Sequence, residues 1–86
     1  MPVVSSFYGI LIYFYFEDHN PPHFHAKYNE FEALIDIETL GIVRGNLPSK
    51  AHSLVVEWGS KHKTALMNDW ELAKANKQPE KIEPLK

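Results

Sequence analysis

The sequence predicts a single α+β domain, in which an antiparallel meander of three to four strands packs on one long or two consecutive C-terminal helices. Three observations support this fold. The chain has 86 residues, a length that fits one domain. Its first half holds short runs of β-branched and aromatic residues, and its second half has apolar residues at helical spacing. We therefore expect a β-meander (1–45), a helical part (46–78) and a tail (79–86).

The first expected strand is Ile10–Phe16, which is β-branched and aromatic on both of its faces. This pattern is typical of a strand that is covered on both sides. The segment Glu17–Pro22 ends the strand, because Asp18 and Asn20 favour turns and its two prolines cannot donate to a β-ladder. A turn is therefore expected before the next strand begins.

Two alternating segments, His23–Tyr28 and Phe31–Ile37, predict a β-hairpin that turns at the two residues between them. The alternation fixes a register in which Phe24 faces the core, while His23 lies opposite Asp36 on the outer face. A slip by one residue would exchange the two faces, so this register is the one we expect.

The helical half follows a short fourth strand expected at Ile42–Arg44, and it begins near Pro48, which the first helical turn tolerates. Apolar residues then recur within one sector of the helical wheel. They are Ala51, Leu54, Val55, Trp58, His62, Ala65, Leu66, Leu72 and Ala73. Gly59 lies among them and leaves open whether there is one helix or two. The tail carries Ile82 and Leu85, which we expect to dock on the body.

Composition narrows the classes of function. The chain has no cysteine, which excludes disulfides and thiolate metal sites. Its net charge is −2 and the lysines of the helical half scatter around the wheel, which favours a solvated surface over nucleic-acid binding. The apolar run Gly9–Phe16 is too short for a membrane span and lacks the flanks of a signal peptide. We therefore expect a cytoplasmic protein with no membrane attachment.

The candidate chemistry lies in the stretch Asp18–His25, which holds three of the five histidines. His23 and His25 are two apart on an expected strand, so their rings leave the same face, and His19 lies in the preceding turn. The three imidazoles are candidate ligands of a divalent metal such as zinc. In a second interpretation, His23, His25 and Asp36 are catalytic residues that perform general acid–base chemistry without a metal.

A structural role is the third interpretation of these residues. His23 could hydrogen-bond Asp36 across the ladder, and His19 could satisfy the backbone of the proline-rich turn. His62 raises the same question, because it lies in the apolar helical sector near Trp58 and could be either a site residue or a satisfied core residue. The residues alone leave these interpretations open.

Four segments of the sequence carry a family resemblance. They are Phe7-Tyr8-Gly9-Ile10, Asp18-His19-x-Pro21-Pro22-His23-Phe24-His25-Ala26, Leu47-Pro48 with Glu57-Trp58, and Ile82-Glu83-Pro84-Leu85. Together they resemble a bacterial family known as domain of unknown function 4160, over nearly the whole chain. One departure is Asn29, where the family more often has glycine. The resemblance implies a small bacterial cytoplasmic protein, whose gene often lies beside a second small gene in toxin–antitoxin-like pairs. It implies no activity and no site residues.

Two functions from different classes remain as hypotheses. The first is an interaction component of a toxin–antitoxin-type gene pair, which forms a homo-oligomer or binds a small protein from the adjacent gene; its basis is the aromatic surface of so small a domain. The second is a metal-dependent or His-based hydrolase, such as a nuclease, that uses His19, His23, His25 and Asp36. Direct binding of nucleic acid through the helical lysines has the weakest support.

Overall fold

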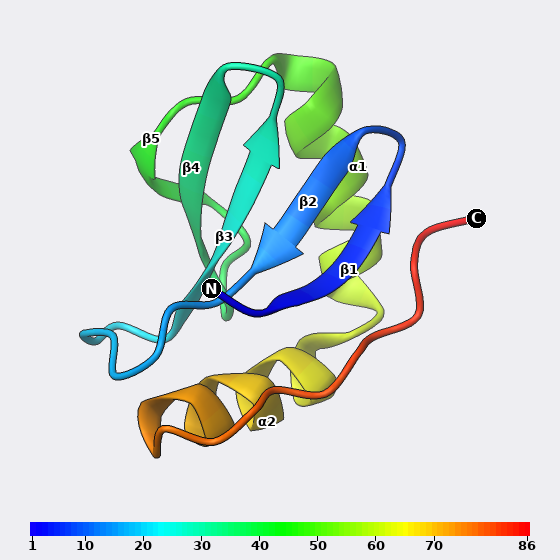
Figure 1. Cartoon of the computed structure of the whole chain (residues 1–86). Coiled ribbons are helices and arrows are strands. Elements are labelled where there is room, and N and C mark those ends of the chain that lie inside the picture. The colour runs from blue at the N-terminus through cyan, green and yellow to red at the C-terminus, as the bar shows by residue number, and fades with distance from the viewer.

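The computed structural model describes residues 1–86 and confirms the α+β fold class. The elements are β1 (Val3–Phe7), β2 (Ile10–Tyr13), β3 (His23–Tyr28), β4 (Phe31–Asp36), β5 (Ile42–Gly45), α1 (Ser49–Ser60) and α2 (Lys63–Lys74). The strands form one antiparallel sheet in the order β1-β2-β3-β4-β5 (Figure 1). The expected number of three to four strands is therefore wrong. Neither helix is long and apolar enough to cross a membrane.

Strand β1 is the element that the sequence analysis missed. Two serines interrupt its apolar pattern, and it turns into β2 through Tyr8 and Gly9, both at positive φ (51° and 80°). Tyrosine seldom adopts this conformation, so the pair is not a familiar hairpin signature. Strand β2 also ends at Tyr13, earlier than expected, and the backbone N–H of Phe14 donates to the carbonyl oxygen of Pro2 at 3.1 Å.

The hairpin of β3 and β4 has the predicted register at all of its pairs, from Tyr28 with Phe31 to His23 with Asp36. Asn29 in the turn has a φ of 53°, a conformation that asparagine tolerates better than most residues. The alternation of apolar and polar residues was therefore sufficient to fix which side chains share each face.

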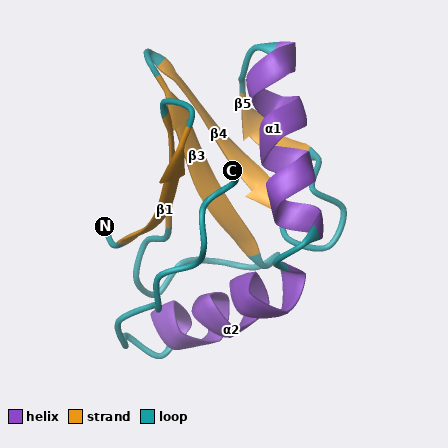
Figure 2. Cartoon of the chain, turned by 90° about the vertical axis from the view of Figure 1, so that its right-hand side faces the viewer, coloured by secondary structure: helices purple, strands orange, loops and turns teal.

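Helix α1 covers one face of the sheet, and α2 lies across the lower end of the sheet as drawn (Figures 1 and 2). Trp58 of α1 packs between the layers, with its ring centroid 5.2 Å from that of Phe7 and 5.9 Å from that of Phe24. The core therefore lies between α1 and the face of the sheet that carries Phe24.

The structure has two consecutive helices, and the break between them falls at Lys61 and His62 rather than at Gly59. Gly59 lies within α1 and has a different role. A Cβ atom there would lie only 2.8 Å from Cδ2 of Leu40, so the missing side chain allows close packing of the helix on the loop before β5.

The C-terminal tail docks on the body, as its apolar residues predicted. Ile82 is buried and its backbone N–H donates to the carbonyl oxygen of Val4 at 2.8 Å, which covers part of the β1 edge. Trp58 donates its indole N–H to the carbonyl oxygen of Glu83 at 2.8 Å. Strand β5 forms the opposite edge of the sheet.

Candidate metal centre

The segment between β2 and β3, residues 14–22, carries the candidate site onto the outer face of the sheet. Glu17 has a φ of 56°, which reverses the chain, and its backbone N–H donates to the carbonyl oxygen of Ala73 in α2 at 3.0 Å. At the other end, the carbonyl oxygen of Pro22 accepts the N–H of Ile37 at 3.1 Å. These contacts hold the segment against the body at both ends and bring Asp18 to the histidines of β3.

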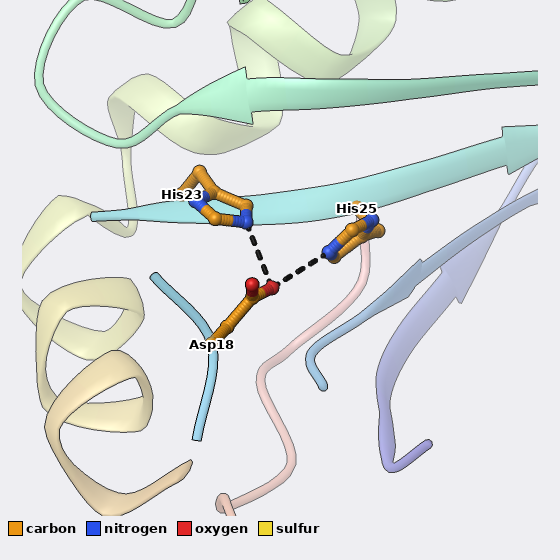
Figure 3. A group of neighbouring side chains, drawn as sticks. All are labelled: Asp18, His23 and His25. Atoms are coloured by element: carbon orange, nitrogen blue, oxygen red, sulfur yellow. Dashed lines mark hydrogen bonds and ion pairs between the residues drawn. The ribbon is translucent and has the colours of Figure 1, made fainter. Parts of the chain in front are cut away.

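Asp18 lies between two imidazole rings (Figure 3). Its Oδ2 atom is 2.9 Å from Nε2 of His23 and 3.2 Å from Nε2 of His25. Its Oδ1 atom accepts the backbone N–H of His19 at 2.9 Å. The side chains of the two β3 histidines are only 4% and 7% exposed, whereas that of Asp18 is 22% exposed. The group is therefore enclosed by protein on the histidine side and reaches solvent through the carboxylate.

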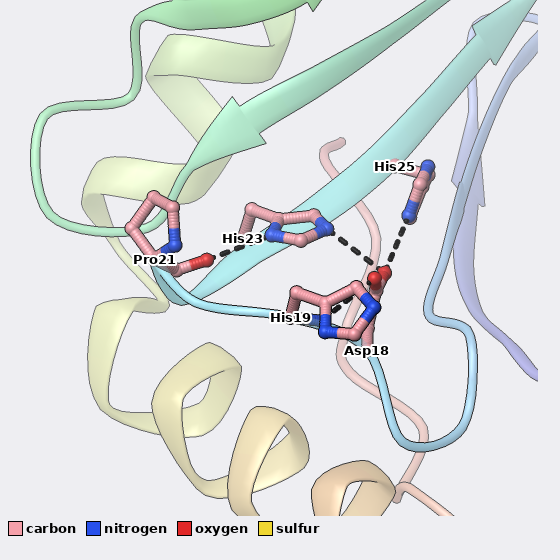
Figure 4. A network of polar contacts seen from close by, with 5 residues as sticks. All are labelled: Asp18, His19, Pro21, His23 and His25. Atoms are coloured by element: carbon pink, nitrogen blue, oxygen red, sulfur yellow. Dashed lines mark hydrogen bonds and ion pairs between the residues drawn. The ribbon is translucent and has the colours of Figure 1, made fainter.

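His23 is oriented from both ends of its ring. Its Nδ1 atom lies 2.8 Å from the carbonyl oxygen of Pro21 (Figure 4). A carbonyl oxygen can only accept, so Nδ1 carries the hydrogen and Nε2 is the atom aimed at Asp18. The ring also packs on Trp70 of α2, with centroids 5.1 Å apart. Metal-binding histidines commonly have this arrangement, in which the second ring nitrogen is fixed by a backbone carbonyl.

His25 is held by aromatic neighbours. Its ring stacks on Tyr13 at 5.2 Å with an interplanar angle of 16°, and Tyr15 meets it edge-on at 4.6 Å. Burial lowers the pKa of His25 from its usual 6.5, and the neighbouring His23 lowers it further, although Asp18 opposes both effects. The neutral imidazole, which is the form that binds metals, is therefore favoured at neutral pH.

The carboxylate of Asp18 stays ionised in this setting. Burial raises its pKa, but hydrogen bonds from the His19 backbone and the His25 ring, together with the field of His23, outweigh that effect. The pKa of Asp18 consequently lies below its usual 3.8. The site thus offers an anionic oxygen beside two imidazole nitrogens.

The spacing of these atoms is close to that of a coordination sphere. One ligand atom from each of Asp18, His23 and His25 lies within 4.8 Å of the other two. Bonds of about 2.0–2.2 Å to a central zinc ion place neighbouring ligand atoms about 3 Å apart, which both oxygen–nitrogen distances already match. Three protein ligands leave a coordination position open, as in catalytic zinc sites, and the same set also suits ferrous iron.

His19 and His62 lie outside this group. The side chain of His19 is exposed and forms no hydrogen bond; its contribution is the backbone N–H given to Asp18. His62 directly precedes α2 and is half-buried; its side chain makes no capping hydrogen bond, and its ring lies 5.4 Å from that of Trp58. The group of possible ligands therefore contains Asp18 where the sequence analysis placed His19.

Asp36 pairs with His23 in the ladder, as predicted, but its carboxylate is used elsewhere. Its Oδ1 atom accepts the backbone N–H groups of Glu38 at 2.8 Å and Thr39 at 2.9 Å. The hydrogen bond between Asp36 and His23 that the structural interpretation proposed does not form, because the turn after β4 takes the carboxylate. Asp18 contacts His23 in place of Asp36, and the sequence offered this residue at the start of the same histidine-rich stretch.

The two imidazoles share the outer face, as the alternation required, but they are not at the surface. Residues 14–22 cover them from one side and Trp70 packs on His23 from another. Strand alternation therefore predicted the face of both side chains, but not which segments fold over that face.

Comparisons with known proteins give one match. Residues 9–71 match the profile of a family described as a domain of unknown function (DUF4160), and this region includes all three possible metal ligands. No curated protein and no solved structure matches the chain. Because the matched region is well over half of the 86 residues, the chain belongs to the DUF4160 family.

Proposed function

We propose that Asp18, His23 and His25 bind one divalent metal ion and that the protein is a metal-dependent hydrolase. The observation that carries the proposal is the sharing of one carboxylate oxygen by two imidazole nitrogens, one of them on a ring already oriented by Pro21. A cation bound there replaces the direct contacts between the carboxylate oxygen and the two ring nitrogens. Zinc is the first candidate, because it binds imidazole and carboxylate together.

An open approach to the site supports a catalytic role over a purely structural one. A hollow of ≈ 170 Å³ adjoins Asp18 and His23 and is bordered on its far side by Val43 and Arg44. Water and a substrate group can therefore reach the ion. A zinc ion with three protein ligands lowers the pKa of its bound water to about 7, which supplies a nucleophile for hydrolysis at neutral pH.

Zinc titration of chelator-treated protein tests the binding step. We expect the unchanged protein to bind one equivalent of zinc, and Asp18→Asn and His23→Gln to lose at least about 100-fold in affinity because each removes a direct ligand. His19→Gln is the matched control, since it changes an exposed imidazole in the same loop. Circular dichroism verifies that each variant is folded. Equal zinc affinity in all four proteins contradicts the site.

Cleavage of an RNA oligonucleotide tests the catalytic step. We expect zinc-dependent cleavage that is lost on chelation and in Asp18→Asn and is kept in His19→Gln. Zinc binding with no hydrolysis would reject the hydrolase and leave a metal-binding protein. Cleavage that persists without metal but disappears in His23→Gln would favour the metal-free, His-based mechanism instead.

A second candidate function is favoured by the free edge of the sheet. We propose that β5 adds a strand from a small protein encoded beside this one, as in a toxin–antitoxin-type pair. Val43 in this strand is 53% exposed, and a hydrophobic edge strand is a site at which another chain can pair.

Light scattering after size exclusion, with and without the neighbouring gene product, tests this pairing. Val43→Lys is the variant in which we expect the pairing to be weakened. A chain that stays monomeric in the presence of the neighbouring gene product counts against this function. A chain that dimerises by itself would show that β5 pairs with a second copy instead.

A further inference from the structure

Arg44 is the only arginine of the chain, and it lies in the same cross-strand row as the candidate metal centre. On the outer face His25 pairs with Leu34, and Leu34 pairs with Arg44. Two strand spacings separate the first and last of these residues, which is about 10 Å between their Cα atoms. The strand register therefore puts the one cation of β5 on the face that carries the site.

Two hollows join Arg44 to the site. One, of ≈ 300 Å³, extends from Arg44 to His25 and Tyr15. The other, of ≈ 170 Å³, extends from Arg44 to Asp18 and His23. A group bound beside the candidate ligands from either hollow would therefore meet the guanidinium on its opposite side.

The guanidinium of Arg44 is free to bind such a group. The residue is exposed, and its side chain takes part in no ion pair and no hydrogen bond. Glu32 lines the larger hollow with it, but the two form no ion pair. An arginine fork that is not engaged by the protein itself suits planar, two-point recognition of an oxyanion.

We propose that Arg44 binds the phosphoryl group of the substrate, so that the hydrolase proposed above acts on phosphate esters. This inference rests on the proposed function. A divalent ion held by one carboxylate keeps one net positive charge, and Arg44 adds a second, which matches a phosphate dianion better than a carboxylate monoanion. Tyr15 is 43% exposed beside the larger hollow and offers a ring against which the organic part of the ester can pack.

The reaction consumes one water per ester. The water oxygen forms a bond to phosphorus, and the ester P–O bond breaks with its electron pair on the departing oxygen. That oxygen takes up a proton from the water. A monoester therefore gives an alcohol and inorganic phosphate, and a diester such as RNA gives an alcohol and a phosphate monoester. Arg44 pairs with the non-bridging oxygens and stabilises the charge they carry as the bonds exchange.

Nitrogen-15 NMR of the zinc-loaded protein gives a direct test, because the only arginine Nε–H resonance belongs to Arg44. Phenyl phosphate is the probe, and we expect it to shift this resonance with saturation. Arg44→Gln should weaken binding at least about tenfold, the usual effect of losing a charge-assisted pair. Lys27→Gln is the matched control, since it removes a cation from β3 that lines neither hollow.

The outcomes separate this inference from the metal proposal. Loss of phenyl phosphate binding in Arg44→Gln but not in Lys27→Gln supports it. Equal affinities in all three proteins overturn it, and an equal response to benzoate overturns the assignment to phosphate. Repeating the titration without zinc shows which proposal fails: Arg44-dependent binding in a protein that takes up no zinc leaves the anion site and removes the metal. If the protein binds zinc but its binding of phenyl phosphate does not depend on Arg44, the metal site stands and the anion site is rejected.

Discussion

His23 donates its Nδ1–H to the carbonyl oxygen of Pro21 at 2.8 Å, and this contact decides what the other side of the ring can do. The two residues are only two positions apart in the chain, so the turn that ends at β3 orients the imidazole locally. Its Nε2 atom is left 2.9 Å from Asp18. A ligand whose orientation is already fixed loses little freedom when an ion arrives, which is the condition for a tight metal site.

Zinc should stabilise the folded protein through Asp18. At a free zinc concentration about 100 times the dissociation constant, we expect a gain of about 2.7 kcal/mol in the free energy of unfolding. For a domain of this size that gain raises the melting temperature by about 10 °C or more. Thermal unfolding of the unchanged protein and His19→Gln should show this rise, and Asp18→Asn should not. An equal rise in Asp18→Asn would mean that zinc binds elsewhere.

Asp69 should make stability depend on pH. The residue is 1% exposed, its Oδ1 accepts the backbone N–H of Glu80 at 2.8 Å, and its Oδ2 has no partner. Burial raises the pKa of Asp69 to about 6, from 3.8. Because the folded-state value is the higher one, its contribution is complete below the unfolded value and is lost as the pH rises from about 4 to about 6.

Replacing the carboxyl group of Asp69 should remove this loss of stability at higher pH. Asp69→Asn keeps the acceptor for Glu80 and cannot ionise, so we expect it to exceed the unchanged protein by about 1–3 kcal/mol above pH 6. The advantage should disappear below about pH 4. Urea unfolding at pH 4 and pH 8, without metal, measures both differences. A variant that is less stable than the unchanged protein at pH 8 contradicts the burial argument.

Gly45 should be essential to the edge strand that carries Arg44. Its φ is +85°, and a Cβ atom there would collide with the carbonyl oxygen of Glu32. We expect Gly45→Ala to cost at least about 2 kcal/mol, because backbone atoms must move. Gly41→Ala is the control, since its Cβ would meet only Thr39 Oγ1, at 3.4 Å. Denaturant unfolding of both variants measures the costs, and equal costs would show that Gly45 has no special role.

Trp58 should hold the C-terminal tail in place. Its indole N–H donates to the carbonyl oxygen of Glu83, and Trp58→Phe removes that donor while keeping an aromatic ring. We expect faster proteolysis within residues 79–86, because one of the few polar anchors of the tail is lost. Trp70→Phe is the control, since the Trp70 ring packs on His23 and forms no hydrogen bond to the tail. Equal cleavage in both variants would exclude the hydrogen bond as the anchor.

The fold was predictable where apolar and polar residues alternate regularly and the adjoining turn has residues that favour turns. The β3–β4 hairpin meets both conditions, and its register was correct throughout. Strand β1 meets neither, because two serines break its pattern and Tyr8 takes a positive φ that sequence preference argues against. The break between the helices lies at His62 rather than at Gly59, since the glycine is kept for close packing on Leu40.

The sequence predicted which face of the sheet carries the candidate site, but it did not predict all of the residues that form the site. Strand alternation put His23 and His25 on the same face. The third possible ligand depended on which carboxylate was not already bound by backbone N–H groups of a turn. Asp36 lies opposite His23 and is taken by the backbone of the turn that follows it. Asp18 reaches the rings only because the chain reverses at Glu17, a backbone conformation that nothing in the local pattern indicated.

The central claim is that a metal ion binds His23 and His25 together, and nitrogen-15 NMR of the five imidazole rings during zinc addition tests it most directly. We predict that the Nε2 resonances of these two rings change at one equivalent of zinc, while those of His19, His52 and His62 stay in place. Changes confined to the other three rings, or no change in any ring, would contradict the claim.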